Sequence, residues 1–233
     1  MGSTRLPGKV LLDLGGDTVL ARVVRRVRRA KLISEIVIAT TASSQDDRIV
    51  AECKRLCVNH FRGEELDVLD RYYHAAQASK ADAVVRITSD CPLIEPEVTD
   101  KVVRVFLDDL PDYASNTQTR TYPRGLDTEI MTAEALARAW KEASKGYQRV
   151  HVTPYLYENP DKFRIRQIVG QRDYSGYRWT LDTPEDLTFL RTVLTCVGND
   201  DRVKWTEILR LLERDQDLAK INQHVAMKAL REG

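Results

Sequence analysis

The first hydrophobic pattern along the chain has the period of a helix. From Val19 to Val27, apolar residues recur every three or four positions, and the arginines between them fall on the opposite face. We therefore predict a helix with one buried apolar face, and we expect its arginines to face solvent. The next apolar run, EIVIATT at 35–41, is short and rich in β-branched residues, which is typical of a buried parallel strand.

Helical and strand patterns continue to alternate up to about residue 115. An alternation of this kind favours the α/β class, with a mostly parallel sheet and helices on both of its faces. The predicted helices cover 45–57, 66–79 and 95–109, and the predicted strands cover 58–61 and the start of 81–94.

The pattern changes after residue 115. Residues 112–131 are polar and rich in turn-forming residues, so we expect only short strands there. The other predicted strands cover 163–170 and 176–182, and the other predicted helices cover 132–144, 150–160, 183–197, 204–215 and 216–230.

Composition narrows the class of protein. The chain has 233 residues, which suits one domain, and its 42% hydrophobic and 30% charged residues are ordinary for a globular protein. Its 36 basic and 35 acidic residues give a formal net charge of +1, so we expect no nucleic-acid partner. No apolar run approaches the roughly 20 residues that span a bilayer, and no signal peptide is recognisable. We therefore expect a cytoplasmic protein that does not bind membranes.

The four cysteines, Cys53, Cys57, Cys91 and Cys196, are scattered without a CxxC pair, which is typical of reduced thiols in a cytoplasm. We expect Cys53 and Cys57 to pack on one helix face, because the sequence offers no two further ligands for a metal site there. Cys91 lies in a polar segment without a base partner, so we assign it no nucleophilic role.

The opening segment GSTRLPGK contains too much glycine and proline for a strand or a stable helix. Glycines let backbone N–H groups approach an oxyanion, Arg5 can bind two phosphate oxygens at once, and Lys9 adds a point charge. The spacing differs from that of a P-loop. The residues alone leave two interpretations open, a phosphate-binding loop or a turn-forming N-terminal segment.

Two aspartates follow predicted strands. Asp90 lies in TSDCPL and Asp182 in WTLDTPEDL, just before a predicted helix whose first-turn Glu185 and Asp186 are explained by the helix dipole. Ligands of a doubly wound sheet bind beyond the carboxyl ends of its strands, and Mg²⁺ takes one or two carboxylates together with phosphate oxygens and water. Asp90 and Asp182 are therefore candidate ligands of one Mg²⁺ ion in a nucleotide-phosphate enzyme, and a turn or capping role is the alternative for Asp90.

Five segments in order, GSTRLPGK, RITSDCPLI, GLDTE, HVTPY and WTLDTPEDL, resemble the cytidylyltransferase family of spore coat polysaccharide biosynthesis protein F. This family is related to CMP-Kdo synthetase and acylneuraminate cytidylyltransferase, and the similarity runs from residue 1 to about residue 230. The resemblance implies a Rossmann-like nucleotidyltransferase fold and a Mg²⁺-dependent reaction. In that reaction a sugar oxygen attacks the α-phosphorus of CTP and releases pyrophosphate, for the synthesis of a surface polysaccharide or glycan.

The resemblance also implies roles for individual residues. The implied nucleotide-binding residues are Gly2, Ser3, Arg5, Lys9, Thr40, Arg71 and Asp90. The implied metal ligands are Asp90 and Asp182, which form the implied catalytic set together with Arg5 and Lys9. The implied sugar-binding residues are Asp127, Glu129 and His151.

Three of these residues have alternative roles. Arg71 can instead pair with Asp67 or Asp70 on its own helix. Asp127 can belong to a turn, and His151 can cap or pack rather than act as a base or a sugar contact.

Relatives in this family carry an apolar strand before the opening loop, whereas this sequence begins at the methionine of that junction. That strand lies centrally in the sheet and anchors the loop. We therefore expect this chain to lack the first strand, to expose strand edges and to catalyse weakly.

The resemblance implies one nucleotidyltransferase domain over residues 1–233, with 115–165 as a sugar-side and dimerisation insertion and 203–233 as a helical tail. A homodimer is expected. Two other functions stay open, a nucleotidyltransferase that uses another base and a non-catalytic subunit that binds nucleotide sugars. Four tyrosines either cover the partner or pack within their own chain, namely Tyr122, Tyr147, Tyr155 and Tyr157.

Overall fold

The strands of the described chain form two sheets. The computed structural model describes residues 2 and 5–226, and in it β1 (Val37–Thr41) pairs in parallel with β2 (Asn59–Gly63). A second sheet has the order β3 (Ala83–Arg86), β5 (Glu129–Thr132), β4 (Tyr113–Ser115) and β6 (Ile165–Gln167). β5 is antiparallel to β3 and β4, while β4 and β6 are parallel, so β3, β4 and β6 point the same way. The α/β prediction is confirmed, with β5 as the antiparallel exception.

The two sheets are not joined by hydrogen bonds between strands. Within residues 2 and 5–226, β1 pairs only with β2, and β3 pairs only with β5. Within the described residues no strand precedes β1, and the family resemblance implies a strand before the N-terminal loop.

Helices occupy most of the ranges in which helical periodicity predicts them. Short 3₁₀ helices, η1 (Lys9–Leu11) and η2 (Ser44–Asp46), lie in connecting segments. The α-helices are α1 (Val19–Val27), α2 (Asp47–Arg55), α3 (Val68–Ala78), α4 (Pro96–Asp109), α5 (Ala133–Glu142), α6 (Gly146–His151), α7 (Pro154–Tyr157), α8 (Pro184–Cys196), α9 (Trp205–Arg214) and α10 (Gln216–Gln223). The predicted tail of 203–233 begins with α9 and α10, and its residues 227–233 lie outside the described chain.

Two predicted elements are wrong in detail. The helix predicted at 150–160 is divided into α6 and α7, because Val152 takes a positive φ of 74° and Pro154 has no N–H with which to continue α6. The strand predicted at 176–182 is reduced to an isolated parallel bridge between Arg124 and Arg178. The chain turns away after Arg124, at Gly125 (φ 105°), before a second residue pair can form.

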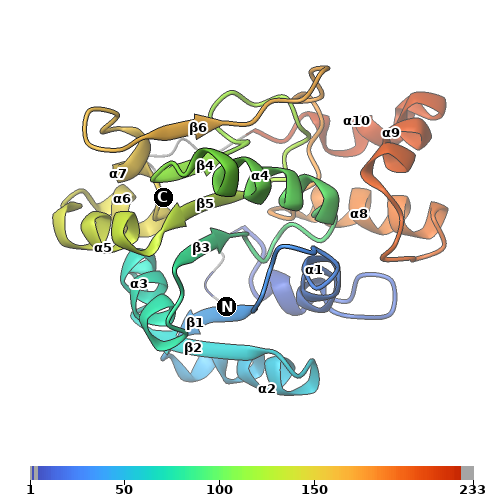
Figure 1. The fold of residues 1–233 in the computed structure, drawn as a ribbon. Helices are drawn as coiled ribbons and strands as arrows, with labels where there is room; N and C mark the ends of the chain where they lie inside the picture. The colour runs from blue at the N-terminus through green and yellow to red at the C-terminus, as the bar shows by residue number, and fades with distance from the viewer. Residues whose placement is uncertain (1, 3–4, 227–233) are drawn as a thin grey trace.

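Helices cover both faces of the four-stranded sheet (Figure 1). On one face Ile130 of β5 packs in a cluster with Val102 and Phe106 of α4. On the other face the next residue of β5, Met131, packs with residues of α3, α5 and α7. Successive strand residues point to opposite faces, so this alternation places each helix layer. The prediction of helices on both faces of the sheet is confirmed.

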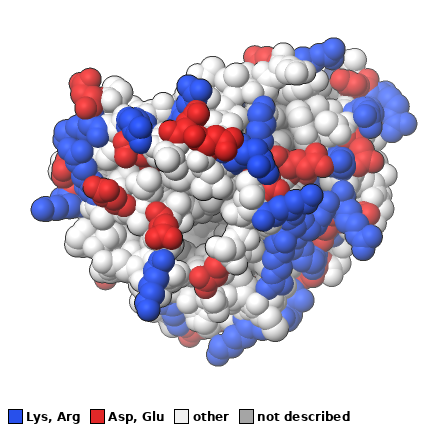
Figure 2. Space-filling view, in the orientation of Figure 1, with Lys and Arg blue, Asp and Glu red and all other residues white. Residues whose placement is uncertain are grey.

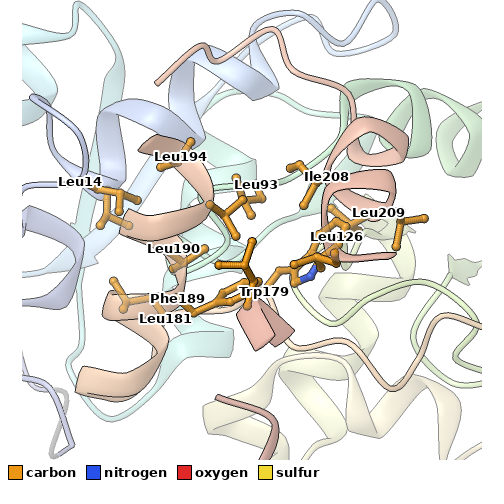
Figure 3. Packing of buried hydrophobic residues seen from close by; sticks show 14 of the residues in the cluster. Leu14, Leu93, Leu126, Trp179, Leu181, Phe189, Leu190, Leu194, Ile208 and Leu209 are labelled. Atoms are coloured by element: carbon orange, nitrogen blue, oxygen red, sulfur yellow. The ribbon is translucent and has the colours of Figure 1, made fainter. Parts of the chain in front are cut away.

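The largest apolar cluster fixes the segment that follows β6. Trp179 and Leu181 are 0% exposed, and they pack against Phe189 and Leu190 of α8 (Figure 3). Leu126 enters the same cluster from the loop between β4 and β5. This packing immobilises residues 179–181, although they form no regular strand.

Of the four tyrosines considered for an interface, at least three pack within their own chain, because Tyr157 packs against the same apolar cluster as Tyr155. Tyr122 and Tyr155 are 5% and 7% exposed and belong to separate apolar clusters. Tyr147 and Tyr157 are partly buried, and Tyr147 donates to Glu158 at 2.8 Å. The alternative of packing within the same chain therefore applies to Tyr122, Tyr155 and Tyr157.

The expectation that the arginines of α1 face solvent is wrong for two of them. Arg22 and Arg26 are 2% and 0% exposed. The Nε of Arg26 donates to the carbonyl oxygen of Ile94 at 2.6 Å, and its Nη atoms donate to the carbonyl groups of Asp201 and Val203 at 2.8 and 3.0 Å. Buried carbonyl groups require donors. The two guanidinium groups supply these donors and attach the 199–203 loop to α1.

The third arginine of α1, Arg25, and the two that follow the helix, Arg28 and Arg29, lie nearer to the surface. Arg28 and Arg29 are exposed and Arg25 is partly buried, and Figure 2 shows Lys and Arg side chains gathered over α1. The expected solvated face of this helix is thus limited to its C-terminal part.

We predict that Arg26→Met destabilises the protein by about 3–5 kcal/mol, because it leaves the buried Glu95 carboxylate, 3.6 Å from Arg26, and three carbonyl groups without their partner. Urea unfolding followed by circular dichroism measures the change. The exposed Arg48→Met is the matched control and should unfold like the wild type. Equal stability of the two variants would contradict the role of Arg26.

Candidate functional site

Lys9 lies between the carboxylates of Asp90 and Asp182. Its Nζ donates to Oδ2 of Asp90 at 2.6 Å and to Oδ1 of Asp182 at 2.8 Å. The three side chains are only 16–20% exposed. Lys9 is 81 residues from Asp90 and 173 residues from Asp182 along the chain, so the fold brings together side chains that are distant in sequence.

Backbone hydrogen bonds connect the two aspartate segments. The carbonyl oxygen of Asp90 accepts a bond from the N–H of Leu181 at 2.8 Å and one from the hydroxyl of Thr180 at 3.3 Å. Asp90 lies in the loop after β3, which ends at Arg86, and Asp182 lies just before α8. The two carboxylates therefore meet beyond the carboxyl end of β3, the place where ligands bind in open α/β sheets.

Two arginines also contact Asp182. The guanidinium groups of Arg5 and Arg178 lie 3.2 and 2.8 Å from its Oδ2. Burial alone would raise the pKa of Asp182, but Lys9, Arg178 and Arg5 outweigh it and leave the pKa below its usual value. Burial alone would lower the pKa of Lys9, but Asp90 and Asp182 raise it above its usual value. Lys9 and Asp182 are consequently ionised at neutral pH.

Asp186 holds this arrangement from within the protein. Its side chain is 0% exposed and accepts bonds from Arg178 Nε at 2.8 Å and from the backbone N–H groups of Asp182 and Thr183 at 2.8 and 3.0 Å. Asn222 of α10 donates a further bond at 2.9 Å. The helix-dipole explanation of Asp186 is therefore incomplete, because this carboxylate orients both Arg178 and the turn that carries Asp182.

Sequence reasoning did not select Arg178 or Asp186. The only available signal is the spacing of Arg178, Asp182 and Asp186, each four residues after the last. On a helix that spacing would place all three on one face. Here only Asp186 is helical, and the contact arises because the 179–181 segment is fixed by packing.

The N-terminal loop turns at Gly8 to place Lys9. Gly8 has a φ of 67°, a left-handed conformation that favours glycine, and it precedes η1. Gly2 is exposed, and a Cβ at that position would lie 3.5 Å from Oε1 of Glu65. The predicted phosphate contact Ser3 lies outside the described residues.

Thr40 and Arg71, the other predicted nucleotide contacts, are engaged with their own chain. Thr40 is 4% exposed, and its hydroxyl donates to the Asp46 carboxylate at 2.8 Å. Burial would raise the pKa of Asp46, but hydrogen bonds that include those from Thr41 and Thr40 lower it to about 2. Arg71 is buried, which lowers its pKa, and its Nη1 donates to the carbonyl groups of Glu64 and Glu65.

The ion pair proposed as an alternative for Arg71 does not form. Among the described residues, Asp67 is paired with Arg149 instead, and Asp70 accepts a bond from the indole of Trp140 at 2.8 Å. A contact of Arg71 or Thr40 with a nucleotide stays a prediction.

The predicted sugar-side carboxylates are each paired with an arginine. Asp127 forms a two-pronged ion pair with Arg120, with one contact at 3.0 Å. Glu129 is 5% exposed, pairs with Arg86 and accepts a bond from the Tyr113 hydroxyl at 2.6 Å.

The third predicted sugar-side residue is His151, the last residue of α6. Together with Asp127 and Glu129 it stays a predicted sugar contact, since no contact with a sugar has been established for any of them.

The four cysteines lie within the described part of the chain and form no disulfide bond there. All four are free, and burial raises the pKa of the Cys91 thiol well above its usual value. Cys53 is buried in α2, but Cys57 is exposed beyond the end of that helix, so the expectation that the two share a helix face is wrong.

Among residues 2 and 5–226, no group of three or more His, Cys, Asp or Glu side chains is placed to hold a metal ion. The pair formed by Asp90 and Asp182 nevertheless fits Mg²⁺, which uses one or two carboxylates and takes its other ligands from phosphate and water. The Nζ of Lys9 marks a position between the two carboxylates where a positive charge is stabilised.

Comparison with known proteins identifies relatives over almost the whole chain. Residues 1–220 match the family model described as cytidylyltransferase. The spore coat polysaccharide biosynthesis protein SpsF of Bacillus subtilis is 33% identical, over 94% of this chain and 93% of that protein. A cytidylyltransferase structure from Leptospira borgpetersenii superposes with a TM-score of 0.91 at 32% identity, covering 98% of this chain and 95% of that one.

A more distant solved structure shares the fold. It is a CMP:2-keto-3-deoxy-manno-octonic acid synthetase complexed with CTP, with a TM-score of 0.65 at 18% identity, covering 84% of this chain and 95% of that one. The nucleotidyltransferase fold expected from the resemblance is confirmed by these structural neighbours.

We predict that Asp186→Asn destabilises the protein by about 3 kcal/mol at pH 7, because it leaves the buried Arg178 guanidinium partly uncompensated. The pKa of Asp186 is lowered, since burial is outweighed by bonds from Arg178, Asn222 and Asp182. Its stabilisation is therefore fully present above about pH 3.8, the usual carboxyl pKa, and is lost as the pH falls through the lower folded-state value.

Urea unfolding between pH 7 and pH 3 tests this prediction. The free-energy difference between wild type and Asp186→Asn should shrink at the acid end of the series. The exposed Glu213→Gln serves as the control. A difference that is independent of pH would show that Asp186 does not act through its charge.

Proposed function

This chain belongs to the cytidylyltransferase family, and we propose that it transfers CMP from CTP to a sugar hydroxyl with the help of Mg²⁺. The observation that carries this proposal is the convergence of Arg5 and Lys9 with the carboxylates of Asp90 and Asp182 at one point. Fixed positive charges beside a pair of carboxylates are the groups that a metal-bound triphosphate requires.

In the proposed reaction a hydroxyl oxygen of the sugar forms a bond to the α-phosphorus of CTP. The bond from that phosphorus to the oxygen bridging to the β-phosphate breaks, pyrophosphate leaves, and the hydroxyl proton passes to solvent or a base. Negative charge grows on the pyrophosphate as the bond breaks. Arg5 and Lys9 are suited to stabilise this charge, because they are fixed before the substrate arrives.

Asp90 and Asp182 are the proposed metal ligands. When bound, Mg²⁺ supplies charge neutralisation for the phosphate oxygens and orients them. For both carboxylates to contact a cation, Lys9 must release them, and a phosphate oxygen offers its ammonium group an alternative partner. A flexible four-carbon side chain permits this exchange.

Arg178 and Asp186 are proposed positioning residues. Asp186 holds Arg178, and Arg178 holds Oδ2 of Asp182 at 2.8 Å. Asp182 is thereby kept ionised and in a fixed orientation before a metal ion binds. Preorganised ligands need no rearrangement when the reaction begins.

The biological setting follows the family resemblance. We propose a cytoplasmic homodimer whose product serves a surface polysaccharide or glycan, as the name of the Bacillus subtilis relative suggests. As far as the chain is described, no helix has both the length and the apolar character that a membrane span requires.

We predict that CTP raises the melting temperature only when Mg²⁺ is present, because the metal ion joins the triphosphate to Asp90 and Asp182. Thermal-shift measurements with CTP, UTP, GTP and ATP, each with and without Mg²⁺, provide the test. A larger rise in melting temperature with another nucleotide would indicate that the enzyme uses that nucleotide instead of CTP. If CTP stabilises the protein but releases no pyrophosphate with any sugar of an acceptor panel, the non-catalytic subunit would be favoured.

We predict that Lys9→Ala and Asp90→Asn each reduce the rate of pyrophosphate release by about 100-fold or more, since each removes a group that acts on transition-state charge. The exposed Lys54→Ala is the control for loss of a lysine and should retain the wild-type rate. Circular dichroism checks that each variant folds. Full activity of a folded Asp90→Asn variant would exclude Asp90 as a ligand of the catalytic metal ion.

A further inference from the structure

A cavity of about 320 Å³ lies between α10 and residues 173–179 of the segment that follows β6. Gln216, Lys220 and Gln223 are exposed and form part of its lining, so a small molecule can enter it from solvent. Lys9, Asp90 and Asp182 are not among its lining residues, which separates it from the proposed reaction centre. Its volume is within the range of small-molecule binding sites.

The walls of this cavity are aromatic and held in place. Trp179 and Phe189 line it and are buried side by side in the largest apolar cluster (Figure 3). Tyr174 and Tyr177 also line it, and the ring of Tyr174 meets the ring of Trp205 edge-on at 5.7 Å. Aromatic rings offer flat apolar surfaces, which suit the apolar faces of a ring-shaped ligand.

Two buried polar groups of the lining residues lack hydrogen-bond partners within the described chain. One is the indole N–H of Trp179. The other is the amide oxygen of Asn222, a residue that is 2% exposed and whose amide nitrogen alone forms side-chain bonds. Buried polar groups are normally paired. A hydroxyl group both donates and accepts, so a ligand that carries several hydroxyl groups would supply both missing partners.

The charged side chains that line the cavity already have partners. Lys220 pairs with Asp217 at 2.7 Å, and the Asp173 carboxylate accepts a bond from the N–H of Ser175 at 2.8 Å. Arg178 pairs with two aspartates. A charged ligand would therefore lose hydration without gaining a free counter-charge, which favours a neutral one.

Asn222 connects this cavity to the proposed reaction centre. Its amide nitrogen donates to the carbonyl oxygen of Arg178 and to Oδ1 of Asp186, both at 2.9 Å. Asp186 in turn orients the turn that carries Asp182. A ligand that donates to the amide oxygen of Asn222 favours this same orientation of the amide. Occupancy of the cavity and binding at Asp182 should consequently strengthen each other.

We propose that the cavity between α10 and residues 173–179 is an effector site for a neutral monosaccharide, whose binding favours the binding of metal-bound CTP. The aromatic walls contact the apolar face of the sugar ring, and its hydroxyl groups pair with Trp179 and Asn222. The effect on CTP rests on the proposed cytidylyltransferase function, whereas the binding of the sugar does not.

Matched neutral and charged sugars test the ligand class on the wild-type protein without CTP. The pairs are glucose with glucuronate, galactose with galacturonate, and N-acetylglucosamine with glucosamine. We expect saturation-transfer NMR titrations to show binding of at least one neutral member, with its charged counterpart at least about tenfold weaker. A pyrophosphate assay with CTP and Mg²⁺ identifies any sugar that is an acceptor, and only sugars that are not turned over are counted.

The variants assign the binding to this cavity. Ala219 of α10 lines it and is partly buried, so Ala219→Phe should fill the space and abolish sugar binding. Ala51→Phe adds the same ring at an exposed position of α2 and should bind as the wild type does. Trp179→Phe keeps an aromatic ring but removes the N–H, and should weaken binding about fivefold. Circular dichroism checks that each variant folds.

The effect on the nucleotide is measured separately. A saturating sugar should lower the Kd of CTP in Mg²⁺ about fivefold for the wild type and for Ala51→Phe. Ala219→Phe should show no such effect, because its cavity is filled.

Four results would overturn the inference. They are the absence of binding by every neutral sugar, equal binding of the charged counterparts, undiminished binding by folded Ala219→Phe, and a Kd of CTP that the bound sugar leaves unchanged. A wild-type protein that binds the sugar but not CTP with Mg²⁺ would instead refute the proposed function, so the two failures are distinguishable.

Discussion

The contact of one ammonium group with two carboxylates holds the N-terminal loop against the rest of the structure. Lys9 reaches Asp90 at the end of β3 and Asp182 before α8, so three distant parts of the chain meet at one point. Groups this buried are stable in the charged state only with partners of opposite charge. The same requirement makes the cluster responsive to a ligand, because a cation at the carboxylates and an anion at Lys9 can replace the internal contacts.

The positions of these charges depend on packing rather than on strand pairing. The segment that carries Arg178 and Asp182 forms only one bridge to a neighbouring strand, but Trp179 and Leu181 within it are completely buried. Asp186 then fixes the polar side chains on the other side of the same segment. Apolar packing and one buried carboxylate therefore do the positioning that a regular strand provides elsewhere, and changes in either are expected to alter the site from a distance.

Local patterns were sufficient to predict much of this structure. The periodicity of 19–27 predicts α1. The rule that ligands bind beyond the ends of strands predicts from the sequence alone that Asp90 and Asp182 lie close together. Burial of Arg22 and Arg26 was not predictable, because their partners include carbonyl groups more than 170 residues away. The alternation in 176–182 resembles that of a strand, but the neighbouring segment turns away at Gly125, which no local pattern of 176–182 reveals.

We propose that Asp90 and Asp182 ligate one metal ion together with the triphosphate of CTP. Proton relaxation enhancement with Mn²⁺ measures it most directly, because this method separates protein-bound Mn²⁺–CTP from the free complex. The account predicts a bound ternary complex for the wild type and its loss in both Asp90→Asn and Asp182→Asn. Binding of Mn²⁺–CTP by both variants as tightly as by the wild type would contradict the account.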